Sequence, residues 1–173
     1  YKLADGPYLV ESLDETLHEP LRQKDLQLRL YYPRTDNACP VIVFSHSAFG
    51  SRENFYLLGQ YWASHGYVCV HPTHIGSDTS VLRKDQPYQA MQKAAADPQN
   101  AINRPKDITF VLDRLTAMNT GDAAFKGKLA LDRIGIAGHS FGGYTTLAIA
   151  GQTFVVARND TQLADARVTA AIQ

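Results

Sequence analysis

The chain has 173 residues, of which 45% are hydrophobic and 20% are charged, a composition typical of a globular domain. Seventeen lysines and arginines balance seventeen aspartates and glutamates, so the net charge of zero argues against a nucleic-acid or polyanion binder. No stretch approaches the roughly 20 apolar residues that span a bilayer, and no leader-like segment opens the chain. Because the chain starts at Tyr1 and not at methionine, a leader can already have been removed, and the sequence leaves the compartment open.

The first 39 residues predict two strands at an antiparallel edge of a mixed sheet. Residues 8–13 form a short, weak candidate. The second is stronger, because Leu26, Leu28 and Leu30 alternate with other side chains before Pro33. Such a period of two indicates a strand with one buried face.

From residue 40 onward the sequence predicts strands that alternate with helices. Apolar runs predict strands at 41–44, 67–71 and 133–137 and the start of another at 168–172, and apolar stripes predict helices at 52–65, 105–121 and 141–151. Pro105 is expected at the first helical position. Residues 73–103 are polar and mixed, with helical character only around 88–96; a connection of this length is usually functional or mobile. Alternation of this kind predicts a parallel sheet built from βαβ units.

Two cysteines, Cys39 and Cys69, are too few for a disulfide framework, and we expect both to be unpaired thiols. A metal site would need more ligands at closer spacing.

The segment with the clearest chemical meaning joins the strand at 133–137 to the helix that follows. It contains G-x-S-x-G, formed by Gly138, Ser140 and Gly142. A nucleophilic serine on a tight strand-to-helix turn needs small residues two positions before and after it, so that strand and helix can approach each other. The helix N-terminus also favours negative charge. We therefore predict Ser140 as a nucleophile; the alternative is a glycine-rich turn with a passive serine.

A second signal follows the first buried strand, in residues 44–50 (Phe-Ser-His-Ser-Ala-Phe-Gly). The loop after this strand can supply one backbone donor to an oxyanion hole, and the residue after the nucleophile supplies the other. By position we expect the N–H groups of Ala48 and Phe141 to be these donors. Taken alone, the segment could equally be an ordinary loop between a strand and a helix.

These motifs resemble the α/β-hydrolase superfamily, more narrowly the dienelactone hydrolases and platelet-activating-factor acetylhydrolase-like esterases, and they are similar to bacterial cutinase-like polyester hydrolases. The resemblance runs from about residue 24 to the C-terminus and is carried by blocks at residues 40–46, 50–54, 63–67, 104–108 and 138–143. The family usually has glycine where this chain has Ser47, so the loop backbone can differ there. The resemblance implies a three-layer α/β fold, with a mostly parallel sheet and helices on both faces. It also implies that residues 1–173 are the N-terminal portion of a single domain, made of the edge strands in 1–39 and the βα units in 40–173, with the C-terminal part missing.

The chain offers no histidine in the expected catalytic order of serine, acid and histidine. All six histidines precede Ser140. We expect His46 to support the oxyanion loop. Candidates for lining the pocket are His46, Phe49, His74 and His139, and also His71. The triad acid and histidine are therefore expected beyond residue 173, in which case this chain alone would be nearly inactive.

The leading hypothesis is a serine-dependent carboxylic-ester hydrolase that acts on small-molecule, lipid or polyester esters without a metal or organic cofactor. One alternative is a hydrolase-fold binding or interaction module, which the missing base favours. Another is acyl transfer or amide hydrolysis on the same fold. The strand at 168–172 would be an open sheet edge, so a complementary C-terminal fragment or a homo-oligomer is a candidate partner.

Overall fold

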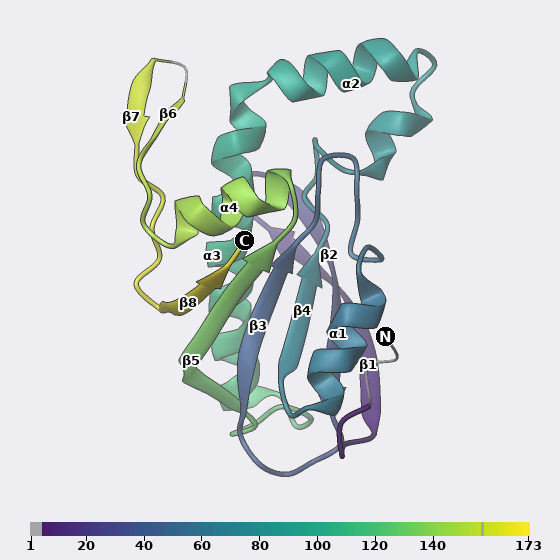
Figure 1. Ribbon diagram of the computed structural model, residues 1–173, viewed down its shortest axis with the longest axis vertical. Helices are drawn as coiled ribbons and strands as arrows, with labels where there is room; N and C mark the ends of the chain where they lie inside the picture. Colours follow the sequence, from purple (N-terminus) through teal and green to yellow (C-terminus); the bar gives the residue numbers. More distant parts are fainter. Residues whose placement is uncertain (1–4, 157) are drawn as a thin grey trace.

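The computed structural model describes residues 5–156 and 158–173. Its centre is a six-stranded sheet with the strand order β1-β2-β4-β3-β5-β8 (Figure 1). These strands are β1 (Val10–Glu19), β2 (Lys24–Pro33), β3 (Cys39–Ser45), β4 (Val68–Pro72), β5 (Leu129–Gly138) and β8 (Val168–Ile172). Strands β4, β3, β5 and β8 run parallel, whereas β2 is antiparallel to both of its neighbours. The predicted mixed sheet and its antiparallel edge are therefore confirmed.

Helices cover both faces of this sheet. They are α1 (Tyr56–Ser64), α2 (Pro87–Ala96), α3 (Pro98–Gly121) and α4 (Phe141–Ile149), with a 3-10 turn η1 (Thr79–Arg83) before α2. Helix α1 lies on one face and α3 runs behind the other, while α2 projects beyond the sheet edge at the top of the view (Figure 1). This arrangement has the three layers that the resemblance implied.

The alternating side chains of the strands build a separate apolar layer on each face. On the side of α3, Leu28 and Val43 belong to one buried cluster with Ile108 and Leu112. On the side of α1, Tyr31 and Cys69 pack with Ala63 and Trp62, among others. Because neighbouring strand residues point to opposite faces, one strand serves both clusters. Both cysteines are buried free thiols, as expected.

Two helix boundaries differ from the predictions. Helix α1 begins at Tyr56 and not near residue 52, because Phe55 has a left-handed backbone (φ 60°) that a helix cannot include. Helix α3 begins at Pro98, where Asp97 accepts a hydrogen bond from the Gln99 amide, so the prediction that Pro105 starts the helix is wrong. Pro105 lies inside α3, where buried residues on both sides of it hold the helix together. A small hairpin of β6 (Phe154–Val156) and β7 (Asn159–Thr161) was not predicted.

The topology brings the two segments of chemical interest to the same sheet edge. In the parallel pair of β3 and β5, Ser45 lies opposite Gly138, so the loop after β3 and the turn after β5 start side by side. Strand β8 is the outermost strand and pairs with β5, which confirms the predicted sheet edge. A partner for that edge remains a prediction. Within the described residues, no helix is both long and apolar enough to cross a bilayer.

Candidate active site

Ser140 occupies a strained turn between β5 and α4. Its backbone angles are φ 57° and ψ −114°, a region that side-chain-bearing residues rarely adopt. Ser140 is exposed, whereas Ile136 and Ala137 just before it are buried. A cost of about 1–3 kcal/mol attaches to such a conformation, and conformations of this kind cluster at functional sites. The turn therefore leaves Ser140 exposed between β5 and α4.

The two glycines of the motif are required by the close approach of strand, turn and helix. A Cβ on Gly138 would lie 2.3 Å from the Gly142 carbonyl oxygen. A Cβ on Gly142 would lie 1.9 Å from the Ser45 carbonyl oxygen, in the neighbouring strand. Since both obstacles are main-chain atoms, no side-chain rotation can relieve them. Their contacts explain why the motif needs glycine at both positions.

The loop after β3 is held in a defined shape on both sides of Ala48. The Gly50 amide donates to the Ser47 carbonyl (3.1 Å), and the Phe49 amide donates to the Ser77 carbonyl (2.6 Å). Phe49 takes the positive φ (62°) in this loop, and Ser47 does not, so a side chain at position 47 costs no backbone strain. Among the described residues, none accepts a hydrogen bond from the Ala48 amide.

The second candidate donor to the oxyanion hole is the Phe141 amide, in the turn after β5. Phe141 is the first residue of α4, and the first amides of a helix have no acceptor inside it. The Gly142 amide, by contrast, donates to the His139 carbonyl (2.9 Å). Because Ser45 and Gly138 lie opposite each other, the Ala48 loop and the Phe141 amide follow neighbouring strand ends. Within the described residues, neither the Ala48 nor the Phe141 amide has a hydrogen-bond acceptor, and amides of this kind can bind a developing negative charge.

The histidines that were expected at the pocket divide into two groups. His46, His71 and His74 are buried, whereas His139 is exposed and its ring lies 5.2 Å from that of Phe55. Phe49 is half-buried. Within the described residues, no histidine makes a hydrogen bond to the Ser140 side chain.

His46 supports the loop, as the sequence suggested. Its Nδ1 donates to the Ser47 carbonyl (2.6 Å), and its Nε2 accepts from the His74 amide (2.9 Å). This pair of contacts requires the neutral ring. Burial, together with the charge of Arg104, lowers the pKa of His46 to about 2, so the ring stays neutral.

A chain of carboxylate, imidazole and hydroxyl runs through the interior below the loop. Asp107 Oδ2 accepts from His74 Nδ1 (2.9 Å), and His74 Nε2 lies 3.0 Å from Ser45 Oγ. These atoms have the order of a catalytic triad. However, the side chains of His74 and Asp107 are completely buried and Ser45 is 0% exposed, so no substrate reaches the Ser45 hydroxyl. This hydrogen-bonded series of Asp107, His74 and Ser45 therefore supports the fold.

The charges around this chain follow from burial. Burial lowers the pKa of His74 well below its usual range and keeps the ring neutral. Burial also raises the pKa of the Asp107 carboxyl, while Lys24 and Arg22, which lie against it, lower it. Arg22 donates to Asp107 at 2.7 Å, and Lys24 at 3.1 Å. These contacts tie the turn between β1 and β2 to α3.

Sequence reasoning gave no role to Arg104 and Asp107, both of which are buried beneath the loop. The available signal was the Arg-Pro-x-Asp block, in which the arginine and the aspartate are three residues apart and share one face of a helix. The block contributed only to the resemblance. Its members are charged residues in a helix that otherwise packs into the core.

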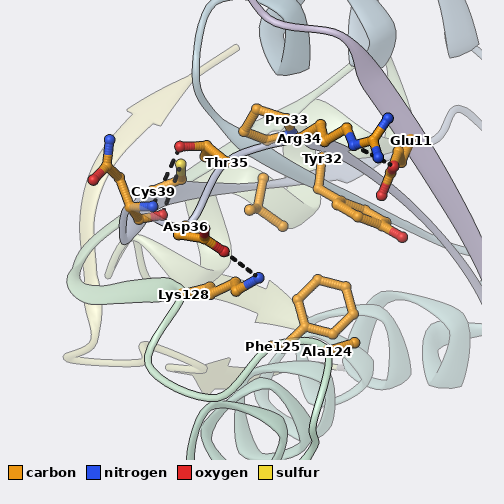
Figure 2. Close-up of a pocket in the computed structure, with 12 residues that line it drawn as sticks. Glu11, Tyr32, Pro33, Arg34, Thr35, Asp36, Cys39, Ala124, Phe125 and Lys128 are labelled. Carbon is orange, nitrogen blue, oxygen red and sulfur yellow. Dashed lines mark hydrogen bonds and ion pairs between the residues drawn. The ribbon is translucent and has the colours of Figure 1, made fainter.

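A separate cavity of about 400 Å³ lies at the other end of the sheet (Figure 2). Cys39, which begins β3, lines it together with Tyr32 and Phe125, whereas Ser45 ends β3 near Ser140. Its charged side chains are already paired, Lys128 with Asp36 and Arg34 with Glu11. The cavity is therefore distinct from the region around Ser140. No cluster of three or more His, Cys, Asp or Glu residues suited to a metal ion occurs in the described part of the chain.

A mostly parallel sheet flanked by helices on both faces, with an exposed, strained serine between β5 and α4, defines the class of α/β-hydrolases. The chain belongs to the dienelactone hydrolase family, whose family model matches residues 26–159.

Individual relatives agree with this assignment. Cutinase 2 of Thermobifida cellulosilytica is 28% identical over 123 residues, which cover 71% of this chain and 38% of the cutinase. Chlorophyllase type 0 of Chenopodium album is 26% identical over 152 residues, which cover 87% of this chain and 38% of the chlorophyllase. The matches thus span less than two fifths of the length of these relatives.

A solved structure shows the same fold. The ferulic acid esterase from Streptomyces cinnamoneus superposes with a TM-score of 0.58 at 22% identity. The superposition covers 80% of this chain and 54% of that chain.

Proposed function

We propose that this chain carries the nucleophile and the oxyanion hole of a serine-dependent carboxylic-ester hydrolase. The observation that carries the proposal is the backbone of Ser140, which is strained, exposed and fixed between two glycines that tolerate no Cβ. Such strain is costly to maintain and serves a nucleophile at a strand-to-helix turn. The names of the relatives, which include cutinases and a ferulic acid esterase, support ester chemistry.

In the proposed reaction, Ser140 Oγ attacks the ester carbonyl carbon while a general base removes the hydroxyl proton. The carbonyl oxygen becomes an oxyanion that accepts hydrogen bonds from the Ala48 and Phe141 amides. The same base then protonates the leaving alcohol, and water hydrolyses the acyl-enzyme with regeneration of the Ser140 hydroxyl. Because no described histidine makes a hydrogen bond to the Ser140 side chain, we propose that the base and its acid come from residues outside these 173.

The surface next to Ser140 favours an ester with an apolar group. Phe55, whose ring contacts that of His139, is 42% exposed, and Tyr56 and Leu57 beside it are 49% and 66% exposed. An exposed apolar patch of this kind is typical of a binding surface. We propose that it contacts the acyl or aromatic part of the substrate, and that residues 73–103, which include η1 and α2, form part of the substrate wall.

The test is hydrolysis of a short-chain p-nitrophenyl ester by the natural protein that contains this chain and by its Ser140→Ala variant. Removal of the nucleophile should lower kcat by about 10⁴–10⁶-fold. Ser12→Ala, which changes an exposed serine of β1, is the matched control and should keep full activity. Activity that survives in Ser140→Ala would contradict the assignment of the nucleophile.

A serine-directed fluorophosphonate probe separates catalysis from binding. The proposal expects one label, located on the peptide that contains Ser140. A natural protein that neither turns over the ester nor takes the label would instead support a hydrolase-fold binding module. Transfer of the acyl group to an added alcohol or amine in preference to water would support the acyltransferase alternative.

A further inference from the structure

Arg104 of α3 is a fully buried cation that contacts every segment around the proposed oxyanion hole. Only 1% of the residue is exposed. Its Nε donates to Thr145 Oγ1 (3.1 Å), its Nη1 to Ser77 Oγ (2.8 Å), and its Nη2 to Ser45 Oγ (3.2 Å) and to the His46 carbonyl. These acceptors belong to the end of β3, the loop before η1, and α4. One guanidinium therefore joins three segments that are far apart in the sequence.

The hydrogen-bond acceptors around the charged Arg104 guanidinium are unusual. Within the described residues, no carboxylate lies within 4.0 Å of its guanidinium, and all of its acceptors are neutral hydroxyl or carbonyl oxygens. Burial lowers the pKa of Arg104 to about 9, so the side chain remains charged at neutral pH. Asp107 raises the pKa of Arg104 through its negative charge but does not contact the guanidinium. A buried charge without a carboxylate in contact is costly, and an apolar residue would serve stability as well or better. The contacts of Arg104 therefore point to a role in positioning the segments that it joins.

Arg104 positions the residues on both sides of the Ala48 amide. Arg104 holds the His46 carbonyl on one side of Ala48. On the other side, the Phe49 amide donates to the carbonyl of Ser77, and the hydroxyl of the same serine accepts from Arg104. The peptide plane of Ala48 is thereby fixed from both directions.

Arg104 also holds the first turn of α4, which carries the Phe141 amide. Thr145 Oγ1 accepts from Arg104 and donates to the Phe141 carbonyl (3.0 Å), so the first turn of α4 is tied to the same cation. The guanidinium also lies 4.5 Å from the centroid of the Phe141 ring, within the range of a cation–π contact. Both candidate oxyanion donors are thus set by one side chain.

We propose that Arg104 is a positioning residue that holds the Ala48 loop and the start of α4 in one fixed arrangement. The inference rests on the proposed function, because the value of this arrangement is the oxyanion hole. Hydrogen-bond donors must be placed to within about 0.5 Å for full transition-state stabilisation. Arg104 itself is buried and does not touch the reacting atoms.

The kinetic test compares Arg104→Lys with Arg167→Lys in the natural protein that contains this chain, with a p-nitrophenyl ester as substrate. Lysine keeps the charge but cannot span the four acceptors. We expect kcat to fall about 10²-fold, with KM within about three-fold, because a misplaced donor weakens binding of the transition state and not of the ester. A rise in KM at unchanged kcat would overturn the proposal.

Arg167 is the matched control because it also joins separate segments, far from Ser140. It binds both Asp165 oxygens, Asp113 and the Thr109 carbonyl, just before β8 begins at the opposite end of the sheet. Arg167→Lys should leave kcat within about two-fold of wild type. An equal loss of kcat in both variants would show a general effect on folding and would overturn the specific role of Arg104.

Hydrogen exchange tests the positioning without any activity. In Arg104→Lys, exchange of the Phe49 and Gly50 amides should become at least about ten-fold faster, because their loop loses its anchor. Arg167→Lys should leave these amides unchanged. Ser77→Ala, which removes one of the four acceptors and is expected to fold, should show a smaller change in the same direction. Unaltered exchange of these amides in Arg104→Lys and Ser77→Ala would overturn the proposal.

The two tests also separate this inference from the proposed function. If the wild-type protein shows no Ser140-dependent turnover, the proposed function fails, and hydrogen exchange still decides whether Arg104 fixes the two segments. If turnover depends on Ser140 but Arg104→Lys retains full kcat, the function stands and the positioning role fails.

Discussion

Replacement of Gly142 by alanine should break the approach of α4 to β3. The new Cβ would lie 1.9 Å from the Ser45 carbonyl oxygen, 2.7 Å from the Ser45 carbonyl carbon and 3.0 Å from the His46 carbonyl oxygen. Ordinary contact begins near 3.4 Å, so the shortest of these distances is too short by about 1.5 Å. Strand β3 cannot yield easily, because it pairs with β4 on one side and β5 on the other.

The size of the effect follows from two opposing contributions. Alanine is favoured over glycine inside a helix by about 1 kcal/mol. Overpacking against a fixed neighbour costs about 1–3 kcal/mol and occasionally more, and here the neighbour is backbone. Because the obstacle is main chain, the cost lies at the upper end of this range, and we expect Gly142→Ala to lower the free energy of unfolding by about 2 kcal/mol. The loss should be accompanied by loss of any Ser140-dependent activity, since the turn itself must move.

Gly143→Ala is the matched control because it makes the same chemical change one residue further along α4. The three atoms nearest to its Cβ would all belong to the side chain of Gln173, the closest being Cγ at 3.0 Å, and that flexible side chain can move aside. The variant should be as stable as wild type or more stable by up to about 1 kcal/mol. Urea denaturation followed by circular dichroism measures both variants. Equal urea midpoints for Gly142→Ala and Gly143→Ala would refute the steric argument.

Two further predictions concern the buried polar groups. Burial lowers the pKa of His71 to about 4 and of His46 to about 2, so each ring must gain a proton on unfolding below pH 6.5. Stability should be complete above about pH 6.5 and should fall by about 1.4 kcal/mol per pH unit for each of these rings between pH 6.5 and pH 4; an unfolding free energy that stays level from pH 7 to pH 5 would contradict this. Asp107→Asn should cost about 3–5 kcal/mol, because it leaves Arg22 and Lys24 without their buried partner. The control Asp113→Asn, at a 62% exposed side chain of the same helix, should cost less than about 1 kcal/mol, and equal losses in thermal unfolding would argue against the importance of burial.

Local signals were sufficient to predict most of the fold. The alternating leucines of β2 and the apolar run of β3 specify strands of different burial, because their periodicity reflects how many faces are covered. The ends of the helices were harder to predict from local signals. Nothing local showed that Phe55 adopts a left-handed backbone, or that α3 continues through Pro105, since tertiary contacts decide both.

The sequence by itself determined the position of Ser140. Glycine two residues before and after a serine, between a β-branched strand and a helix, predicts a tight strand-to-helix turn, and the contacts of Gly138 and Gly142 supply its physical reason. The choice of Ala48 and Phe141 as donors rested on the same positional logic, and it stays a prediction until the kinetics are measured.

Only the tertiary structure decided what lies beneath these residues. His74, Asp107 and Arg104 are separated along the chain and come together because α3 crosses behind the sheet under the ends of β3 and β5 (Figure 1). Their charges and hydrogen bonds depend on distance and burial, which no spacing in the sequence encodes. For the same reason, the sequence did not show that His46 and His74 are both buried beneath the loop. Local sequence specifies the strained turn, whereas the packing of distant segments sets the environment of its serine.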